Sequence, residues 1–150
     1  MDWELLTSLQ LGRYAEYFAK MEFASYGMEV YSSEVDDHGI DFIVKDKNGR
    51  FCEIQVKSLR SLGYVFMQKR KFNIENKNLY MVLLIFKKGS LPDIFLIPST
   101  AWEEPNEVLV DRNYDRAGQK SLPEWGINIS NKNYYILEIF DFKDSIKKFL

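Results

Sequence analysis

The sequence has very few of the residues that hold small secreted domains or zinc sites together. It contains one cysteine, Cys52, and one histidine, His38, among 150 residues. A single cysteine cannot form an internal disulfide, and it excludes a thiolate-rich zinc site. The first residues, Met1 to Glu4, lack the positively charged and apolar segments of a secretory signal. We therefore expect a protein of the reducing cytoplasm.

Long apolar runs and a strong excess of one charge are also missing. The longest apolar run, Leu79 to Phe86, is too short to cross a bilayer and is typical of a central strand. A net charge of −2 argues against binding nucleic acid with the whole surface, although a local basic patch remains compatible with it. With 46% hydrophobic residues and no repeat or low-complexity tract, residues 1–150 are expected to form a single domain.

The order of expected elements is that of an α/β protein. Helical periodicity from Trp3 to Gly27 predicts a first helix. Three strands are expected next, over residues 28–35, 40–45 and 50–58. Residues 65–68 are compatible with a short edge strand, and a turn or short helix over 71–78 then leads into a strand at 79–87. A final helix is expected over 141–150. This pattern predicts a mixed central β-sheet flanked by helices.

The third expected strand carries polar side chains on one face. Because strand side chains alternate, Glu53, Gln55 and Lys57 point to the same side, and the residues between them are apolar. Buried Glu and Lys are costly unless they are paired or bound to a metal, so this face is a candidate site. The alternative is the solvent face of an edge strand, with Lys57 paired to Glu53.

Whether Asp41 joins this polar face depends on the hairpin before the third strand. A two-residue turn would place Asp41 opposite Val56, on the wrong face. A three-residue loop over 47–49 places it opposite Gln55 instead. We predict the three-residue loop, or a bulge near Gly39 with the same effect.

Four segments together resemble the PD-(D/E)xK nuclease superfamily. They are Gly12-Arg13-Tyr14-Ala15-Glu16, Gly27, Gly39-Ile40-Asp41 and Glu53-Ile54-Gln55-Val56-Lys57-Ser58. The resemblance is greatest to the Holliday-junction-resolvase-like and Mrr-like branches, and to bacterial domains of unknown function with this core. It covers residues 12–86. It implies a restriction-endonuclease-like core in the order αβββαβ, and hydrolysis of DNA phosphodiester bonds with magnesium or manganese. By resemblance a homodimer is also expected.

Each catalytic role has a candidate. Hard oxygen ligands suit magnesium, and Asp41, the amide oxygen of Gln55 and Glu16 would supply them, with Glu53 as a weaker ligand. Lys57 would orient the nucleophilic water or stabilise the developing charge. Gln55 stands where most members of the superfamily carry Asp or Glu, which removes one negative charge. The alternative is a catalytically inactive module that binds nucleic acid or a protein partner.

A local basic zone follows the candidate site. Between Ile54 and Ile74 there is no acidic residue, and the cations are Lys57, Arg60, Lys69, Arg70 and Lys71. They are candidate contacts to DNA phosphates, or else a solvated loop.

Two further groups of residues have both a functional and a purely structural interpretation. The aromatics Tyr64 and Phe66 would stack on bases or pack in the core. Asp36, Asp37 and His38 would add a ligand to the metal or form a solvated turn.

Overall fold

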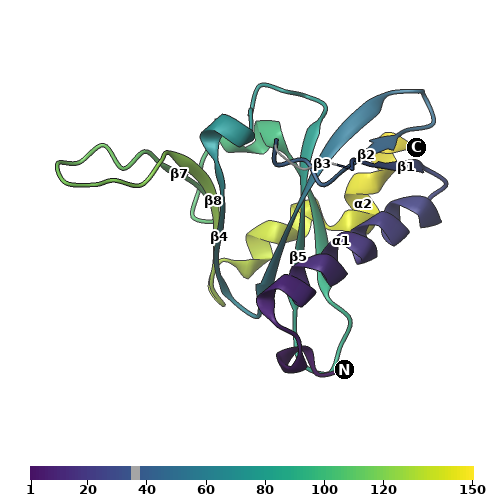
Figure 1. The fold of residues 1–150 in the computed structure, drawn as a ribbon, viewed down its shortest axis with the longest axis horizontal. Helices are drawn as coiled ribbons and strands as arrows, with labels where there is room; N and C mark the ends of the chain where they lie inside the picture. The colour runs from purple at the N-terminus through teal and green to yellow at the C-terminus, as the bar shows by residue number, and fades with distance from the viewer. Residues whose placement is uncertain (35–37) are drawn as a thin grey trace.

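The computed structural model of the chain describes residues 1–34 and 38–150. Its centre is a five-stranded sheet in the order β1-β2-β3-β5-β6 (Figure 1). The strands are β1 (Glu29–Ser32), β2 (Phe42–Lys45), β3 (Phe51–Arg60), β5 (Leu79–Phe86) and β6 (Asp93–Pro98). Only β3 and β5 pair in parallel among these neighbours, so the sheet is mixed. The predicted α/β class is confirmed.

Helix α1 (Ser8–Ser25) packs on one face of this sheet. It begins with a capping box, in which Thr7 and Gln10 each accept the other's backbone N–H, and Gly27 follows its end with a φ of 80°. Small buried residues, Ala15 and Ala19, allow the helix to approach the sheet closely. The first core forms between α1 and the Cys52–Ile54 face of β3.

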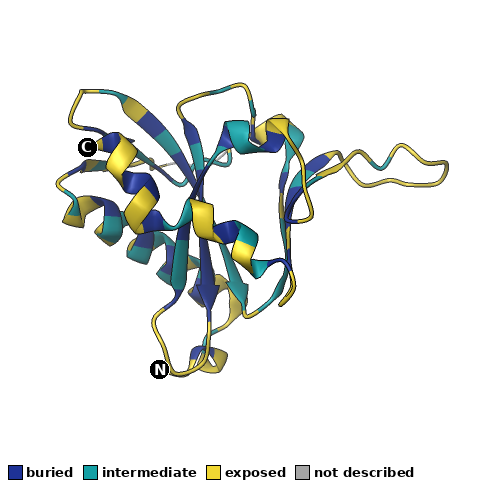
Figure 2. Ribbon diagram, turned by 180° about the vertical axis from the view of Figure 1, so that it is seen from behind, coloured by how far each residue is buried: buried dark blue, intermediate teal, exposed yellow. Residues whose placement is uncertain are grey.

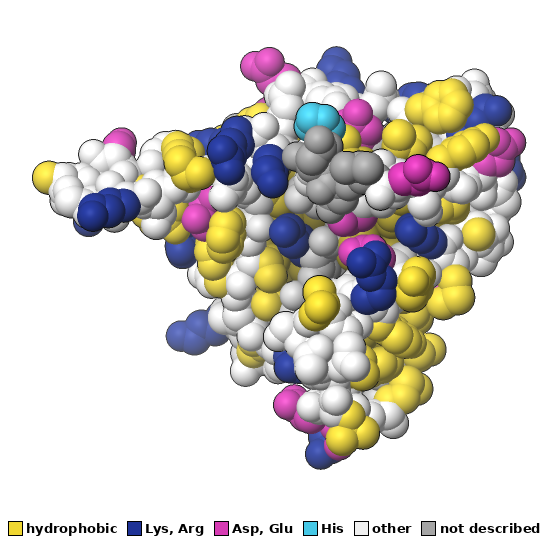
Figure 3. Space-filling view, viewed as in Figure 1, with side chains coloured by type: hydrophobic (Ala, Val, Ile, Leu, Met, Phe, Trp, Pro, Cys, Tyr) yellow, Lys and Arg dark blue, Asp and Glu magenta, His cyan; other side chains and the backbone are white. Residues whose placement is uncertain are grey.

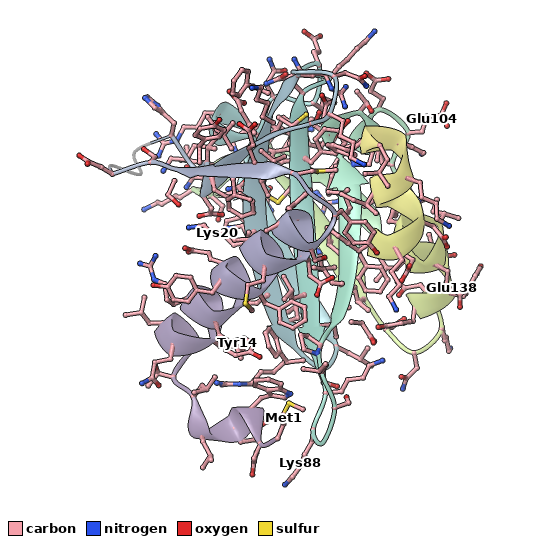
Figure 4. All side chains as sticks on the ribbon, turned by 90° about the vertical axis from the view of Figure 1, so that its right-hand side faces the viewer. Met1, Tyr14, Lys20, Lys88, Glu104 and Glu138 are labelled. Atoms are coloured by element: carbon pink, nitrogen blue, oxygen red, sulfur yellow. The ribbon has the colours of Figure 1, made fainter. Side chains whose placement is uncertain are left out.

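The two ends of the chain complete this first layer. A short 3-10 helix, η1 (Trp3–Leu5), precedes α1, and the Gly89 N–H donates to the Met1 carbonyl (3.0 Å). Figure 4 accordingly shows Met1 beside Lys88. The expected final helix is formed by α2 (Phe142–Ser145) and the 3-10 helix η5 (Ile146–Phe149), whose buried side chains join the same core.

A second, antiparallel sheet covers the other face in the order β4-β8-β7. Its strands are β4 (Gly63–Gln68), β7 (Leu109–Arg112) and β8 (Glu124–Ile129). Together with the 3-10 helices η3 (Ser99–Glu103) and η4 (Tyr134–Phe140), it encloses a second core of buried side chains. In Figure 2 the central strands of the five-stranded sheet are coloured mostly as buried. The exposed connection between β7 and β8 extends from the body as an arm (Figures 1 and 2).

The link from β3 to β5 differs from the expected order αβββαβ. It contains strand β4 and a one-turn 3-10 helix, η2 (Lys69–Lys71), in place of an α-helix. Residues 64–67 are aromatic, β-branched or Met, which favours a strand. After η2, Asn73 and Asn76 accept hydrogen bonds from backbone N–H groups two residues ahead (both 3.0 Å), and these local turns compete with helix formation.

None of the helices in the described ranges is both long and apolar enough to span a membrane.

Candidate active site

The hairpin between β2 and β3 has the predicted register. The ladder pairs Phe42 with Ile54, and the Asp46 N–H donates to the Arg50 carbonyl (2.9 Å) at its closed end. Residues 47–49 form the loop, and Gly49 adopts a φ of 81°. This is the predicted three-residue loop, and one further step of the ladder places Asp41 opposite Gln55.

A buried carboxylate holds this loop in place. Asp46 Oδ1 accepts the backbone N–H groups of Asn48 (2.9 Å) and Arg50 (2.8 Å), and Oδ2 accepts Arg50 Nε (3.2 Å). Burial alone would raise the pKa of Asp46, but the hydrogen bonds from Arg50 and Asn48 outweigh burial and hold the pKa below its usual value. The register of the candidate site is therefore anchored by an ionised side chain.

Asp41 lies immediately before β2 and is tied to β3. Its N–H donates to the Ile54 carbonyl (2.9 Å), and its Oδ2 accepts the Val56 N–H (2.6 Å). The first bond fixes the backbone of Asp41 against β3, and the second orients its carboxylate toward the middle of that strand. Because a backbone N–H holds this carboxylate in one orientation, it can contact a ligand in the cleft at a defined position.

Asp41, Gln55 and Lys57 line one cleft of about 480 Å³. The opposite wall comes from β4, residues 64–68, and Lys71 contributes from η2. Gln55 and Lys57 face this wall because the alternate residues of β3 face α1. Figure 3 shows Lys and Arg side chains gathered on this side of the molecule, between the arm and the body.

The side chain of Gln55 is the unusual feature of the cleft. It is 7% exposed, and its Oε1 has no hydrogen-bond donor among the described residues. Gly39, with a φ of 80°, lies against it: a Cβ there would lie 3.3 Å from Gln55 Nε2 and 3.3 Å from Lys71 Cβ. A buried acceptor without a donor is costly, so it marks a position for a cation or for a donor group of a ligand.

The two glutamates predicted as ligands do not line the described part of the cleft. Glu16 lies on α1 and forms an ion pair with Arg13 (2.9 Å). Helix α1 packs on the face of β3 opposite to Gln55. Glu53 accepts a hydrogen bond from Asn76 Nδ2 (3.0 Å). Within residues 1–34 and 38–150, no three His, Cys, Asp or Glu side chains form a group suited to a metal.

Apart from Lys57, which belongs to the candidate site itself, the four cations of the basic zone have different environments. Arg60 donates to the Leu6 carbonyl and lines a different cavity. Lys69 pairs with Asp111 and lies 3.9 Å from the centroid of the Trp125 ring.

The other two cations are on η2 near the cleft. The exposed Arg70 donates from Nε to Gln68 (2.7 Å). Only Lys71 lines the described cleft.

Of the polar cluster before Gly39, His38 is exposed, and Asp36 and Asp37 lie outside the described residues. Sequence reasoning did not assign the β4 wall to the site. The only signal was the spacing of Tyr64 and Phe66 by two residues, which places both rings on one face of a strand.

The fold is a nuclease-like α/β fold. The chain is similar in structure to Hjc, a Holliday junction resolvase from the archaeal hyperthermophile Archaeoglobus fulgidus. The TM-score is 0.52 at 13% identity, over 93% of this chain and 98% of that one. A bacterial homing endonuclease, I-Ssp6803I, aligns with a TM-score of 0.47 at 14% identity, over 93% of this chain and 97% of that one. No protein-family model matches the sequence, and no curated protein matches it.

Proposed function

We propose that this protein is a metal-dependent DNA endonuclease of the PD-(D/E)xK type, which hydrolyses phosphodiester bonds in the cleft at Asp41. The observation that carries the proposal is the convergence of Asp41, Gln55 and Lys57 on one cleft, with the buried oxygen of Gln55 lacking a described donor. A carboxylate and an amide oxygen can supply part of the oxygen shell of a divalent cation, and an ammonium group can stabilise the charge that develops on the phosphate. The nuclease-like fold supports the same conclusion.

Magnesium or manganese, when bound, would neutralise charge on the phosphate and lower the pKa of a water. Asp41 and the Oε1 of Gln55 would hold the cation, and only part of its shell would come from the protein, as is usual for magnesium. The Lys57 ammonium group, on the same face of β3, would orient the attacking water or stabilise the charge that develops on the phosphate. Lys71 would hold the neighbouring phosphate.

A second function has an observation of its own. Asp41 is the one carboxylate that the described residues contribute to the cleft lining, which favours a nuclease fold that binds nucleic acid or a protein partner without cleaving it. The two functions differ in whether the protein cleaves DNA, and cleavage by the first function should depend on Lys57.

The test is a titration of magnesium or manganese into the protein with supercoiled and branched DNA. We expect metal-dependent nicking, reduced roughly 100-fold or more in Lys57→Ala because the charge that stabilises the transition state is removed. Lys45→Ala is the matched control, because Lys45 lies on the neighbouring strand β2 and pairs with Glu29 (3.7 Å). Equal DNA binding by the wild type and by Lys57→Ala, with no cleavage by either, would favour the non-catalytic module.

A further inference from the structure

Two aromatic rings form a ledge on the β4 wall of the cleft. Tyr64 and Phe66 lie on the same face of β4, with ring centroids 6.3 Å apart and ring planes 21° apart. Both line the cleft that contains Asp41, and Phe66 is 46% exposed. Solvent therefore reaches an apolar ring beside polar groups.

Tyr64 is held firmly behind Phe66. Its hydroxyl donates to the buried Glu124, and the guanidinium carbon of Arg112 lies 4.1 Å from its ring centroid. The ring crosses β8 at Gly126, where a Cβ would lie 2.2 Å from the tyrosine oxygen. Burial and the Glu124 hydrogen bond raise the pKa of Tyr64 well above its usual range, so the phenol stays neutral. The ledge is consequently a rigid surface.

The charges around the ledge suit a nucleic-acid strand. Lys71 lines the same cleft, and the exposed Arg112 of β7 lies against the Tyr64 ring. The exposed Arg70 of η2 contacts Gln68 at the end of β4. Cations that follow a phosphate backbone beside aromatic rings that stack on bases are the combination found in single-strand binding sites.

We propose that Phe66, backed by Tyr64, stacks on an unpaired base next to the phosphate bound in the cleft. The preferred substrate is then DNA with a single-stranded segment at the cleft, because the bases of a continuous duplex already stack on one another inside the helix. This inference rests on the proposed function for its choice of DNA. It adds a residue that determines which DNA structure is bound.

The test measures binding in EDTA, without cleavage, by fluorescence anisotropy with a labelled oligodeoxythymidine strand and with a blunt hairpin duplex. We expect Phe66→Ala and Phe66→Leu to lose roughly tenfold in affinity for the single strand, and Phe66→Trp to retain it, because stacking needs an aromatic ring. Affinity for the duplex should change little. Tyr135→Ala is the matched control, because Tyr135 is an aromatic residue 65% exposed on η4 and outside the cleft.

Two results would overturn the inference: single-strand binding that is unchanged in Phe66→Ala and Phe66→Leu, or a loss of equal size on the duplex. Failure of the wild type to bind the single strand would overturn it as well. Circular dichroism checks that each variant folds. Nicking with manganese is measured separately, so selective stacking without cleavage would contradict the proposed function alone, and cleavage without selective stacking would contradict this inference alone.

Discussion

At the scale of single residues, Gln55 sets the charge of the candidate site. Its neutral amide lies opposite Asp41 in a buried position, where a second carboxylate would repel the first. The neutral amide lowers the attraction of the site for a cation. It also avoids repulsion with Asp41, so the cleft can fold when no cation is bound. This balance gives a prediction that distinguishes a metal site from an ordinary buried amide.

Gln55→Glu should make folding stability depend on a divalent cation. In EDTA the added buried charge should lower the free energy of unfolding by roughly 2 to 4 kcal/mol, because it lies next to the carboxylate of Asp41 and the Gln55 Oε1 that it replaces accepts no hydrogen bond among the described residues. Manganese or magnesium should restore this loss and raise the melting temperature with concentration, as expected for a ligand that binds only the folded state. Thermal and urea unfolding with and without the cation measure the effect.

Gln68→Glu is the control for this substitution. Gln68 lines the same cleft from β4, where Arg70 already contacts its amide oxygen, so the added charge should be tolerated without metal. A Gln55→Glu variant whose stability is the same with and without divalent cations would show that no cation binds beside Asp41.

At the scale of the elements, the β2–β3 loop determines which residues meet. The bonds that Asp46 accepts fix a three-residue loop, and the loop fixes the face on which Asp41 lies. A side chain outside the cleft thus controls its composition.

Asp46→Ala should lower the free energy of unfolding by about 2 kcal/mol at pH 7, because it removes the acceptor for two backbone N–H groups and for Arg50. The pKa of Asp46 is lowered in the folded protein, so its contribution is complete above the unfolded pKa of about 3.9 and is lost as pH falls through the folded value. The difference between the wild type and the variant should therefore shrink below about pH 4. Urea unfolding from pH 7 to pH 3 measures this.

Asp144→Ala serves as the comparison, since Asp144 is an exposed carboxylate that pairs only locally with Lys147 (2.8 Å). It should change stability little at any pH. An Asp46→Ala loss that is constant from pH 7 to pH 3 would mean that the ionised form does not stabilise the loop.

The elements also show what could be predicted from the sequence. Local signals sufficed for α1, for the strands of the hairpin and for the register of Asp41, because a cap, an alternation and a loop length determine them. A short strand over 65–68 is compatible with the sequence, but its place in the wall of the cleft could not be predicted, because β4 pairs with β8 and contacts such as Tyr64 with Glu124 join residues 60 positions apart. Whether Glu16 lines the cleft likewise depends on which face of the sheet α1 covers, and Glu16 is not among the lining residues.

At the scale of the whole molecule, the net charge of −2 gives little attraction for DNA at long range. If the protein binds DNA as proposed, binding relies on a few cations near the cleft, and some cations of the basic zone are engaged elsewhere in the fold. Arg60 supports the segment before α1, and Lys69 joins β7 and β8 through Asp111 and Trp125. A run of basic residues in a sequence therefore does not by itself form a surface that binds nucleic acid.

Lys71 and Lys69 are two residues apart and should behave differently. Lys71→Ala should weaken DNA binding and lower the slope of log affinity against log salt by about one, because one phosphate contact is lost. Lys69→Ala should leave the slope unchanged and lower the free energy of unfolding by about 1 kcal/mol, because it removes the contacts to Asp111, Asn113 and Trp125. Anisotropy titrations in EDTA at several salt concentrations, together with urea unfolding, separate the two effects. Equal slopes for Lys71→Ala and the wild type would mean that the cleft does not contact the DNA backbone through η2.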